Sequence, residues 1–430
     1  MKNAVIASAN ALGLARSTCR PPLALALALA LFPAAAPAQE PGSELTVYLV
    51  TAGAGDAIFE RFGHNAIWIH DPVRGTDLAY NWGLFDFDQP AFMRRFLMGR
   101  MLYTMGPQSM TDVLAEYRYR NRSVRAQELN LTPVQKQSLL EFVEWNARPE
   151  NRDYRYDYYR DNCSTRVRDV LDRTLGGALR RTLEPQPANS TYRSETRRLM
   201  VNDIPTLTGM NLAMGPLIDQ ALSAWNESFI PMEFAEWVRD VQVQGADGRM
   251  VPLVKSERTL FQADRAEPPD VAPNLLPWYL LAGVSFAAVL LLLGSLRARW
   301  SRITFGVLAG VWSLVIGVLG LLIAGLWAFT DHAVTYRNEN VLQANVLSLV
   351  LLVALIALAL RASWAQRLAA RMSLLIAGLA VLGLVIQIVP GLDQANAGII
   401  ALLLPAHVAV AWVLSRRPAP TAPVKGTAYP

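Results

Sequence analysis

Apolar and polar residues alternate in short runs over the first half of the chain, and this pattern predicts strands. Glu44–Thr51, His64–Asp71 and Asp77–Gly83 are rich in β-branched and aromatic residues and are separated by turn-forming residues. A mixture of helices and mostly antiparallel strands predicts an α+β domain. The other elements predicted in this part are strands at Met101–Gly106 and Ser123–Leu131, helices at Gln89–Met98, Thr111–Arg118 and Thr132–Asn146, and a hairpin around Asp247–Gly248.

The pattern changes after residue 274 to long, almost uninterrupted apolar runs. Each run approaches or exceeds the roughly 20 residues that a helix needs to cross a hydrocarbon core of about 30 Å. We therefore expect an all-α transmembrane domain of five helices. The runs are Leu276–Leu296, Ile303–Phe329, Val341–Leu360, Leu374–Val389 and Ala397–Leu414.

The N-terminus has the features of a secretory leader. Lys2, Arg16 and Arg20 precede the apolar run Leu23–Phe32, and a small-residue cleavage pattern follows at Ala36–Gln39. These features predict the following organisation: a signal peptide over residues 1–38, a periplasmic domain over 39–262, a linker over 263–274, the five spans over 275–415 and a cytoplasmic tail over 416–430.

Arginines set the orientation of the spans. The connections after the first and third spans and the C-terminal tail carry nine Lys and Arg residues, whereas the other two connections carry only Arg337. Because cations stay on the cytoplasmic side, the C-terminus is predicted to be cytoplasmic and the N-terminal domain to lie outside the cytoplasm. This indicates a multi-pass membrane protein, and the family resemblance described below implies that the membrane is the bacterial inner membrane and the N-terminal domain periplasmic. The net charge of +5 partly reflects these anchoring residues and does not indicate a nucleic-acid partner.

Cys163 is the only cysteine expected in the mature protein, because Cys19 lies in the predicted leader. Asn162 is a good N-cap, which makes Cys163 the first residue of a helix whose apolar stripe includes Val167 and Leu171. A thiol at a helix N-terminus meets unpaired N–H groups and the positive end of the helix dipole, which favour the thiolate. The alternative is a small core side chain, but a lone thiol in an oxidising compartment favours a functional role.

A nucleophilic thiol needs a base and a group that orients the base. His64, at the start of a predicted strand, is the favoured base, while His70, near the turn at Pro72, is interpreted as a solvated strand-end residue. Asn81 on the neighbouring strand is the preferred third member, with Asp86 as the alternative. Two histidines without a second cysteine are too few for a closed zinc site. We therefore predict no metal and no cofactor.

Three strings of the chain resemble one family. "GDAIFERFGHNAIWI" (Gly55–Ile69), "AYNWGLFDF" (Ala79–Phe87) and "YYRDNCSTRVRDVL" (Tyr158–Leu171) are similar to the N-terminal periplasmic domain of the Lnb-type lipoprotein N-acyltransferases. More distantly, a histidine on a strand followed by "NC" at a helix start resembles the permuted papain-like enzymes of the lecithin–retinol acyltransferase group. The resemblance covers most of residues 45–240.

The resemblance implies an acyl thioester on Cys163 with His64 as the base. The acyl donor would be a membrane phospholipid and the acceptor the N-terminal amine of a lipoprotein. Arg160 and Arg166 are candidates for binding lipid phosphate, although ion pairs with neighbouring aspartates are an alternative. In "FTDHAVTYRNENVLQANVLSL" (Phe329–Leu349), polar side chains either complete the lipid-binding cleft or only solvate a loop; the candidates are His332, Asn338 and Asn340.

Two other functions remain open at this stage. A cysteine peptidase or amidase acting on cell-wall peptides would use the same dyad with water as the acceptor. A non-catalytic envelope scaffold would need the thiol only for structure. The oligomeric state is not indicated by the sequence.

Overall fold

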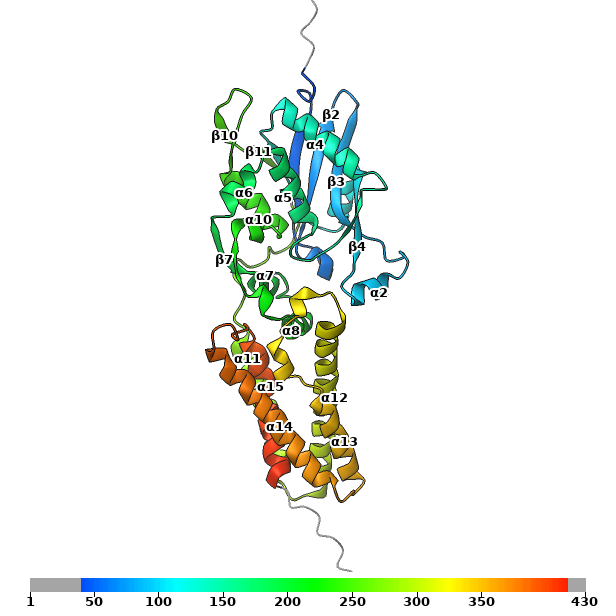
Figure 1. Ribbon diagram of the computed structural model, residues 1–430, viewed down its shortest axis with the longest axis vertical. Coiled ribbons are helices and arrows are strands. Elements are labelled where there is room, and N and C mark those ends of the chain that lie inside the picture. The colour runs from blue at the N-terminus through cyan, green and yellow to red at the C-terminus, as the bar shows by residue number, and fades with distance from the viewer. Residues whose placement is uncertain (1–39, 417–430) are drawn as a thin grey trace, which may run out of the picture. The chain divides into compact units, whose positions relative to one another are not determined.

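A computed structural model describes residues 40–416 of the chain. It contains an N-terminal α+β domain with a seven-stranded antiparallel sheet, followed by five long apolar helices (Figure 1). The predicted leader, and all of the predicted tail except Arg416, lie outside the described residues. The strands are β1 (Thr46–Ala52), β2 (His64–Asp71), β3 (Thr76–Leu84), β4 (Leu102–Ser109), β5 (Val124–Leu129), β6 (Asp153–Arg155), β7 (Pro187–Thr191), β8 (Ala221–Ser223), β9 (Gln242–Gln244), β10 (Met250–Pro252) and β11 (Val254–Phe261).

The large sheet has the order β11-β5-β1-β2-β3-β4-β6, so β2 lies in its middle. β2 pairs with β1 from Ala52↔His64 to Thr46↔His70, and with β3 from Ala66↔Asn81 onwards. The strands predicted around His64, Asn81 and Val124 are confirmed, as is the β9–β10 hairpin.

Helices cover both faces of the sheet. The first face, with Ile67 and Trp82, packs against α4 and α5, which Figure 1 shows lying across the sheet; Leu171 of α5 belongs to the same core cluster. The opposite face, with Ala66 and Trp68, packs against α3. Helices of this domain are α2 (Phe92–Leu97), α3 (Met110–Tyr119), α4 (Pro133–Asn146), α5 (Cys163–Thr174), α6 (Ala178–Leu183), α7 (Tyr192–Leu199), α8 (Ile204–Ala213), α9 (Ala224–Glu227) and α10 (Pro231–Trp237), with 3-10 turns at Ile58–Glu60, Pro216–Ile218 and Val238–Asp240.

The edge strand β11 was not predicted from the sequence. Its residues "VKSERTLF" are mostly exposed and polar, so the strand lacks the apolar run expected of a buried strand. Pairing with β5 and cross-strand ion pairs such as Lys255–Glu128 hold it in place. Residues 262–275, after β11, contain neither helix nor strand.

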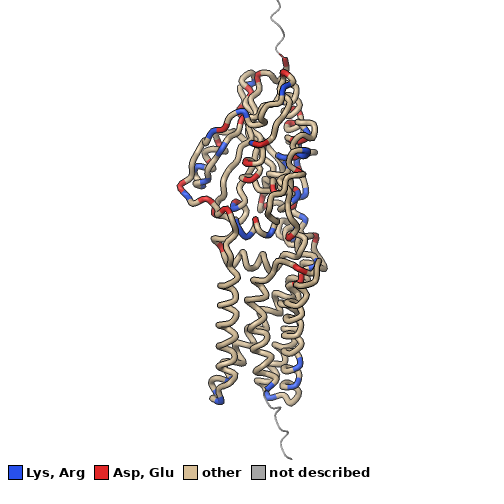
Figure 2. The backbone as a smooth tube through the Cα atoms, turned by 90° about the vertical axis from the view of Figure 1, so that its left-hand side faces the viewer, with Lys and Arg blue, Asp and Glu red and all other residues tan. Residues whose placement is uncertain are grey.

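Five helices are long and apolar enough to cross a membrane. Lys and Arg residues gather at one end of these helices (Figure 2), as expected for a cytoplasmic side. The helices are α11 (Leu276–Ser295), α12 (Arg299–Phe329), α13 (Leu347–Ala359), α14 (Ala365–Val385) and α15 (Ala397–Arg416), with 3-10 turns at Ala333–Thr335, Glu339–Leu342 and Ile386–Ile388. The third span, Glu339–Ala359, combines the turn at Glu339–Leu342 with α13, and the fourth, Ala365–Ile388, combines α14 with the turn that follows it.

Side chains of the segment between α12 and α13 cap the C-terminal end of α8. Asn338 Nδ2 donates to the carbonyl oxygens of Leu212 and Ala213 at 2.8 and 2.9 Å. Asn340 Nδ2 donates to those of Asn211 and Leu212 at 3.1 and 3.0 Å. The last carbonyl groups of a helix have no partner within the helix, so these amides supply the missing donors. Polar pairing therefore ties the α+β domain to the spans.

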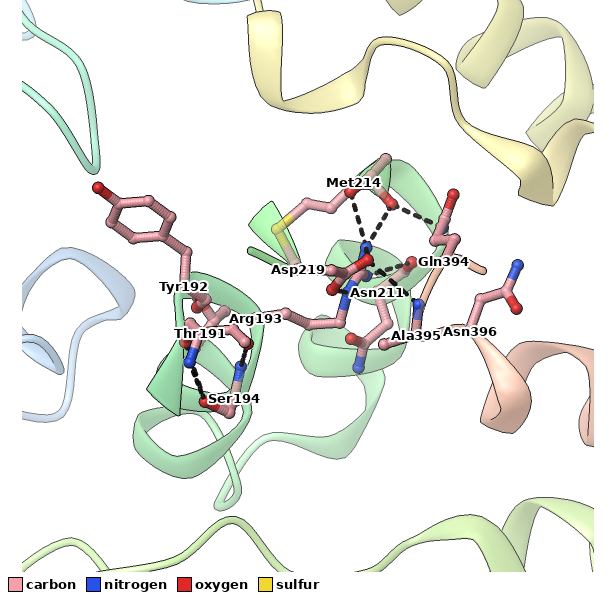
Figure 3. Close-up of polar contacts among 12 residues, drawn as sticks. Thr191, Tyr192, Arg193, Ser194, Asn211, Met214, Asp219, Gln394, Ala395 and Asn396 are labelled. Carbon is pink, nitrogen blue, oxygen red and sulfur yellow. Dashed lines mark hydrogen bonds and ion pairs between the residues drawn. The ribbon is translucent and has the colours of Figure 1, made fainter. Parts of the chain in front are cut away.

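A buried arginine supports the same junction (Figure 3). Arg193, on α7, is 1% exposed, and its Nε and Nη2 donate to the Asp219 carboxylate at 2.5 and 3.2 Å. Its guanidinium also donates to the carbonyl oxygens of Met214 and Gly215 at 3.1 and 2.8 Å. Asp219 in turn accepts from the backbone N–H of Ala395, which lies just before α15.

Replacing Arg193 by methionine should therefore destabilise the full chain. The substitution leaves Asp219 and several carbonyl groups without their donor, and losing one partner of a buried pair costs about 3–5 kcal/mol. For a domain of this size we expect the Tm of the detergent-solubilised protein to fall by roughly 6–12 °C. Arg249→Met, in the exposed β9–β10 turn, is the control and should leave the Tm unchanged. An unchanged Tm for Arg193→Met would show that this pair does not stabilise the junction.

Candidate active site

The N-terminus of α5 is capped as the sequence predicts. Asn162 Oδ1 accepts hydrogen bonds from the backbone N–H groups of Ser164 and Thr165, both at 2.9 Å. Its Nδ2 donates to the carbonyl oxygens of Tyr158 and Phe229, so all its polar atoms are engaged. Cys163 is therefore the first residue of α5. The side chain of Asn162, which caps the helix, is held in place by these four hydrogen bonds.

The first turn of α5 is bound to the start of β2 through Asn65. Asn65 Nδ2 donates to Ser164 Oγ at 3.0 Å, and Asn65 Oδ1 accepts from Thr51 Oγ1 on β1 at 2.9 Å. Ser164 Oγ in turn donates to the carbonyl oxygen of Ser228. Asn65 and Ser164 are fully buried, where such bonds are costly to break. These bonds fix the position of the neighbouring Cys163.

The space beside Cys163 depends on a glycine. Gly83 interrupts the register between β3 and β4 and has φ +86°, a conformation that side chains other than glycine rarely adopt. A Cβ at Gly83 would lie 3.3 Å from Cys163 Cβ and 3.7 Å from the ring of Tyr156. The missing side chain at Gly83 thus leaves room at the end of the sheet that Cys163 fills, and we call this contact between Gly83 and Cys163 the gap.

The thiol of Cys163 is buried, and burial raises its pKa above the ordinary value. Three backbone N–H groups, of Asn65, Ser164 and Cys163 itself, and the charge of Arg122 act in the opposite direction. Burial outweighs them, so the predicted preference for a thiolate is wrong for the resting protein. The helix terminus does favour the anion, but removal of the sulfur from water costs more.

His64 is oriented by Asn81. His64 Nε2 lies 3.0 Å from Asn81 Oδ1. Asn81 Nδ2 donates to Gln108 Oε1 at 2.9 Å and to the carbonyl oxygen of Ala79 at 3.2 Å, so its oxygen must face the imidazole. His64 therefore carries its proton on Nε2, and Nδ1 keeps a lone pair with which it can act as a base.

Burial lowers the pKa of His64 to about 4, a shift that the bond to Asn81 opposes and the charge of Arg122 reinforces. The imidazole is therefore neutral at pH 7. Both the thiol of Cys163 and the imidazole of His64 are therefore neutral in the resting protein.

His64 and α5 approach the gap from opposite faces of the sheet. By strand alternation His64 shares the face of Ala66, against α3, whereas Asn65 points to α5. The backbone N–H of Asn65, which belongs to the peptide unit that joins Asn65 to His64, is one of the groups that lower the pKa of the thiol. His64 and Cys163 thus lie near the same end of β2 but on opposite faces of the sheet, and among the described residues the imidazole is hydrogen-bonded to Asn81 and not to the thiol.

Comparison with known families identifies this part of the chain. Residues 33–198 match the model of the family described as the Lnb N-terminal periplasmic domain. The match covers less than half of the chain and does not reach the five apolar helices. No curated protein and no solved structure matches the chain. With five candidate spans after the Lnb domain, the chain is a multi-pass membrane protein with a periplasmic N-terminal domain.

The alternative candidates, His70 and Asp86, do not lie beside His64 or Asn81. His70, at the far end of β2, is exposed and lies 3.4 Å from Asp77. Asp86 accepts a bond from the backbone N–H of Asp88 in a turn. Neither is hydrogen-bonded to His64, whose partner among the described residues is Asn81.

The two candidate arginines differ from each other. Arg166 pairs with Asp161 and stacks 4.2 Å over the ring of Tyr154, so its guanidinium is engaged. Arg160 is exposed, and only its backbone N–H has a hydrogen bond, to Asp157, among the described residues. Of the two, only Arg160 leaves its charge free for a phosphate.

The outer-loop candidates bind other parts of the protein. His332 Nε2 lies 3.0 Å from the carbonyl oxygen of Phe96, at the end of α2. Asn338 and Asn340 are fully buried, and both donate all their amide hydrogens to α8. The two asparagines thus have no donor left for a lipid, and their role in the structure is to join α8 to the spans.

Several residues of the site were not predicted from the sequence. Asn65 and Gly83 shape the gap, Gln108 orients Asn81, and Arg122 supplies the positive charge near both the thiol and the imidazole. Of these residues, only Gly83 could have been noticed in the sequence, because a glycine at the end of a predicted strand can mark a bulge. The described residues 40–416 contain no group of three His, Cys, Asp or Glu side chains able to hold a metal.

The raised pKa of Cys163 predicts a specific pH profile for alkylation of the full chain by iodoacetamide. Because only the thiolate reacts, the rate should rise about tenfold per pH unit from pH 6 to 8, with a midpoint above the roughly 8.5 of a free thiol. Peptide mass spectrometry measures the rate, and the urea-unfolded chain, with an ordinary midpoint, is the control. A rate plateau between pH 5 and 7 would reveal a thiolate–imidazolium pair and contradict the neutral resting state.

A pair of glycine variants tests the gap beside the sulfur. Gly83→Ala and Gly75→Ala both place a Cβ at positive φ, but Gly75 has no atom within 4 Å of that Cβ. Both should lose about 1–2 kcal/mol of stability from backbone strain. Only Gly83→Ala should also slow alkylation of Cys163, by at least about tenfold, because its methyl group crowds the thiol. Equal alkylation rates in the two variants would contradict this assignment.

Proposed function

We propose that this chain is a membrane-anchored thiol acyltransferase. Cys163 accepts a fatty acyl group from a membrane phospholipid and passes it to the N-terminal amine of a lipoprotein. The observation that supports the proposal is the His64–Asn81 hydrogen bond, which orients the imidazole at the end of β2 where the next residue, Asn65, is bonded to the first turn of α5 beside Cys163. The α5-on-sheet arrangement supports a permuted papain-like architecture, and the match to the Lnb periplasmic domain supports the lipoprotein acceptor.

In the first half-reaction the sulfur of Cys163 attacks the ester carbonyl carbon of the lipid. His64 Nδ1 takes the thiol proton as the S–C bond forms, so no free thiolate is needed beforehand. The tetrahedral oxyanion then collapses, the C–O bond of the ester breaks, and the leaving alkoxide takes the proton from His64. The products are the acyl thioester and a lysophospholipid.

In the second half-reaction the lipoprotein amine attacks the thioester carbonyl carbon. His64 accepts the proton of the amine, and the C–S bond breaks as the amide forms. The sulfur then recovers its proton from His64. Asn81 keeps the imidazole in one orientation through both halves, which is the task of the third group in such a triad.

Backbone donors are available for the oxyanion. The N–H of Cys163 lies at the sulfur and belongs to the first turn of α5, whose N–H groups have no partner within the helix. One such donor contributes about 3–4 kcal/mol to stabilising the transition state in comparable sites.

The membrane spans favour a lipid substrate over a soluble one. A peptidase or amidase would need only the periplasmic domain, whereas both acyl donor and acceptor of the proposed reaction are held in the bilayer. Hydrogen bonds from the α12–α13 segment hold the α+β domain at that surface.

The two histidines of β2 provide a matched test. The full chain, incubated in vesicles of phosphatidylethanolamine and phosphatidylglycerol, should acquire a hydroxylamine-sensitive acyl adduct on the Cys163 peptide. His70→Ala should acylate normally, while His64→Ala should acylate at least about 100-fold more slowly, since general-base catalysis is worth 10²–10⁴. Cys163→Ala should give no adduct.

The acceptor is tested in cells. Mass spectrometry of lipoprotein N-termini in a deletion strain should show the loss of an N-acyl group, restored by the unaltered chain and not by Cys163→Ala. Unchanged N-termini would contradict the acceptor assignment. Release of cell-wall peptides without any acyl adduct would instead indicate the peptidase.

A further inference from the structure

An exposed apolar patch surrounds α2. Phe87, Met93, Phe96 and Leu97 are 64%, 63%, 40% and 59% exposed, and we call these four residues the α2 patch. Contiguous apolar surface of this kind marks a contact with a membrane or another molecule more often than a free surface. Arg94, between Met93 and Phe96, is exposed as well, so the patch combines large apolar side chains with a cation.

The α2 patch is attached to the point where α12 ends. α12 ends at Phe329, and the backbone N–H of Asp331 donates to the carbonyl oxygen of Met98 at 2.9 Å. The Asp331 carboxylate pairs with Arg100 and Arg155 at 2.9 and 2.7 Å. Gly99 allows this approach, since a Cβ there would lie 2.8 Å from the backbone nitrogen of His332.

The length of α12 gives the level of this attachment. The apolar run from Ile303 to Phe329 is about 40 Å long at 1.5 Å per residue, close to the roughly 40–45 Å of a bilayer with its headgroups. Phe329 therefore lies at the outer headgroup region, and the α2 patch, bonded two residues further on, lies at the same level.

A continuous series of rings connects the α2 patch to the nucleophile. Phe96 stacks on Phe92 with ring centroids 6.3 Å apart, and Phe92 on Phe85 at 6.3 Å. The series continues from Phe85 to Tyr103 at 5.0 Å and from Tyr103 to Tyr156 at 4.1 Å. Tyr156 borders the gap at Gly83 that Cys163 occupies.

We propose that the α2 patch immerses in the outer leaflet and that the ring series from Phe96 to Tyr156 binds one acyl chain of a phospholipid on its way to Cys163. The second part rests on the proposed function, while the first stands independently of it. Aromatic and aliphatic side chains beside a cation are the composition of interfacial elements. Arg94 would meet the headgroup phosphate while the chain lies along the rings.

Immersion is measured with spin labels, because the chain has only two cysteines. In the full chain with Cys19→Ser and Cys163→Ser, single cysteines are introduced as Leu97→Cys, Val311→Cys or Tyr119→Cys and labelled with a nitroxide in phosphatidylcholine–phosphatidylglycerol nanodiscs. Val311, on α12, is the lipid control, and Tyr119, 91% exposed at the end of α3, is the water control.

The label at Leu97 should resemble the one at Val311 in its relative accessibility to oxygen and to a water-soluble nickel complex. That ratio should exceed the ratio at Tyr119 by at least about fivefold. A label at Leu97 that behaves like the one at Tyr119 would overturn immersion and indicate a protein partner for the patch instead.

The acyl-chain path is tested in protein that retains Cys163. Met93→Glu combined with Leu97→Glu places two charges on one side of α2. Val134→Glu is the control, because Val134 is an exposed apolar residue of α4, outside the α2 patch. The double variant should lower the rate of Cys163 acylation from vesicles at least about tenfold and leave alkylation by iodoacetamide unchanged.

An unchanged acylation rate in the double variant would overturn the path. If the unaltered protein is never acylated, the proposed function fails, yet the spin-label result at Leu97 still decides whether the patch lies in the leaflet.

Discussion

The candidate site depends on the attachment of α5 to β2 through Asn65. Its side chain bonds to Ser164, and its backbone N–H is one of the groups that lower the pKa of Cys163, so one residue acts on both the helix and the thiol. The same residue follows His64 directly in the chain. The backbone of β2 therefore places His64 directly before the residue that positions the first turn of α5.

Much of the fold could be predicted from local patterns. β2 was predicted with its observed limits because alternation and turn residues agree there, and Asn162 was identified as a cap because few residues suit that position. The contact between His64 and Asn81 follows from pairing neighbouring strands. β11 escaped prediction because an exposed edge strand has no apolar signal.

Other features depend on the whole fold and have no local signal. The charge state of Cys163 reflects how much water is excluded around it, which a helix-terminus argument does not contain. Arg122 and Gln108 reach the site only through the sheet topology. Asn338 and Asn340 were predicted to bind lipid, but their hydrogen-bond partners are carbonyl groups of α8, more than a hundred residues away in the chain.

The buried, protonated sulfur has a further consequence in the periplasm. Peroxide and exchange with other disulfides both act on thiolates that solvent can reach. Cys163 is buried and protonated, so it resists becoming a sulfenic acid or a mixed disulfide. Burial can thus keep a reactive thiol reduced in an oxidising compartment until a substrate reaches it.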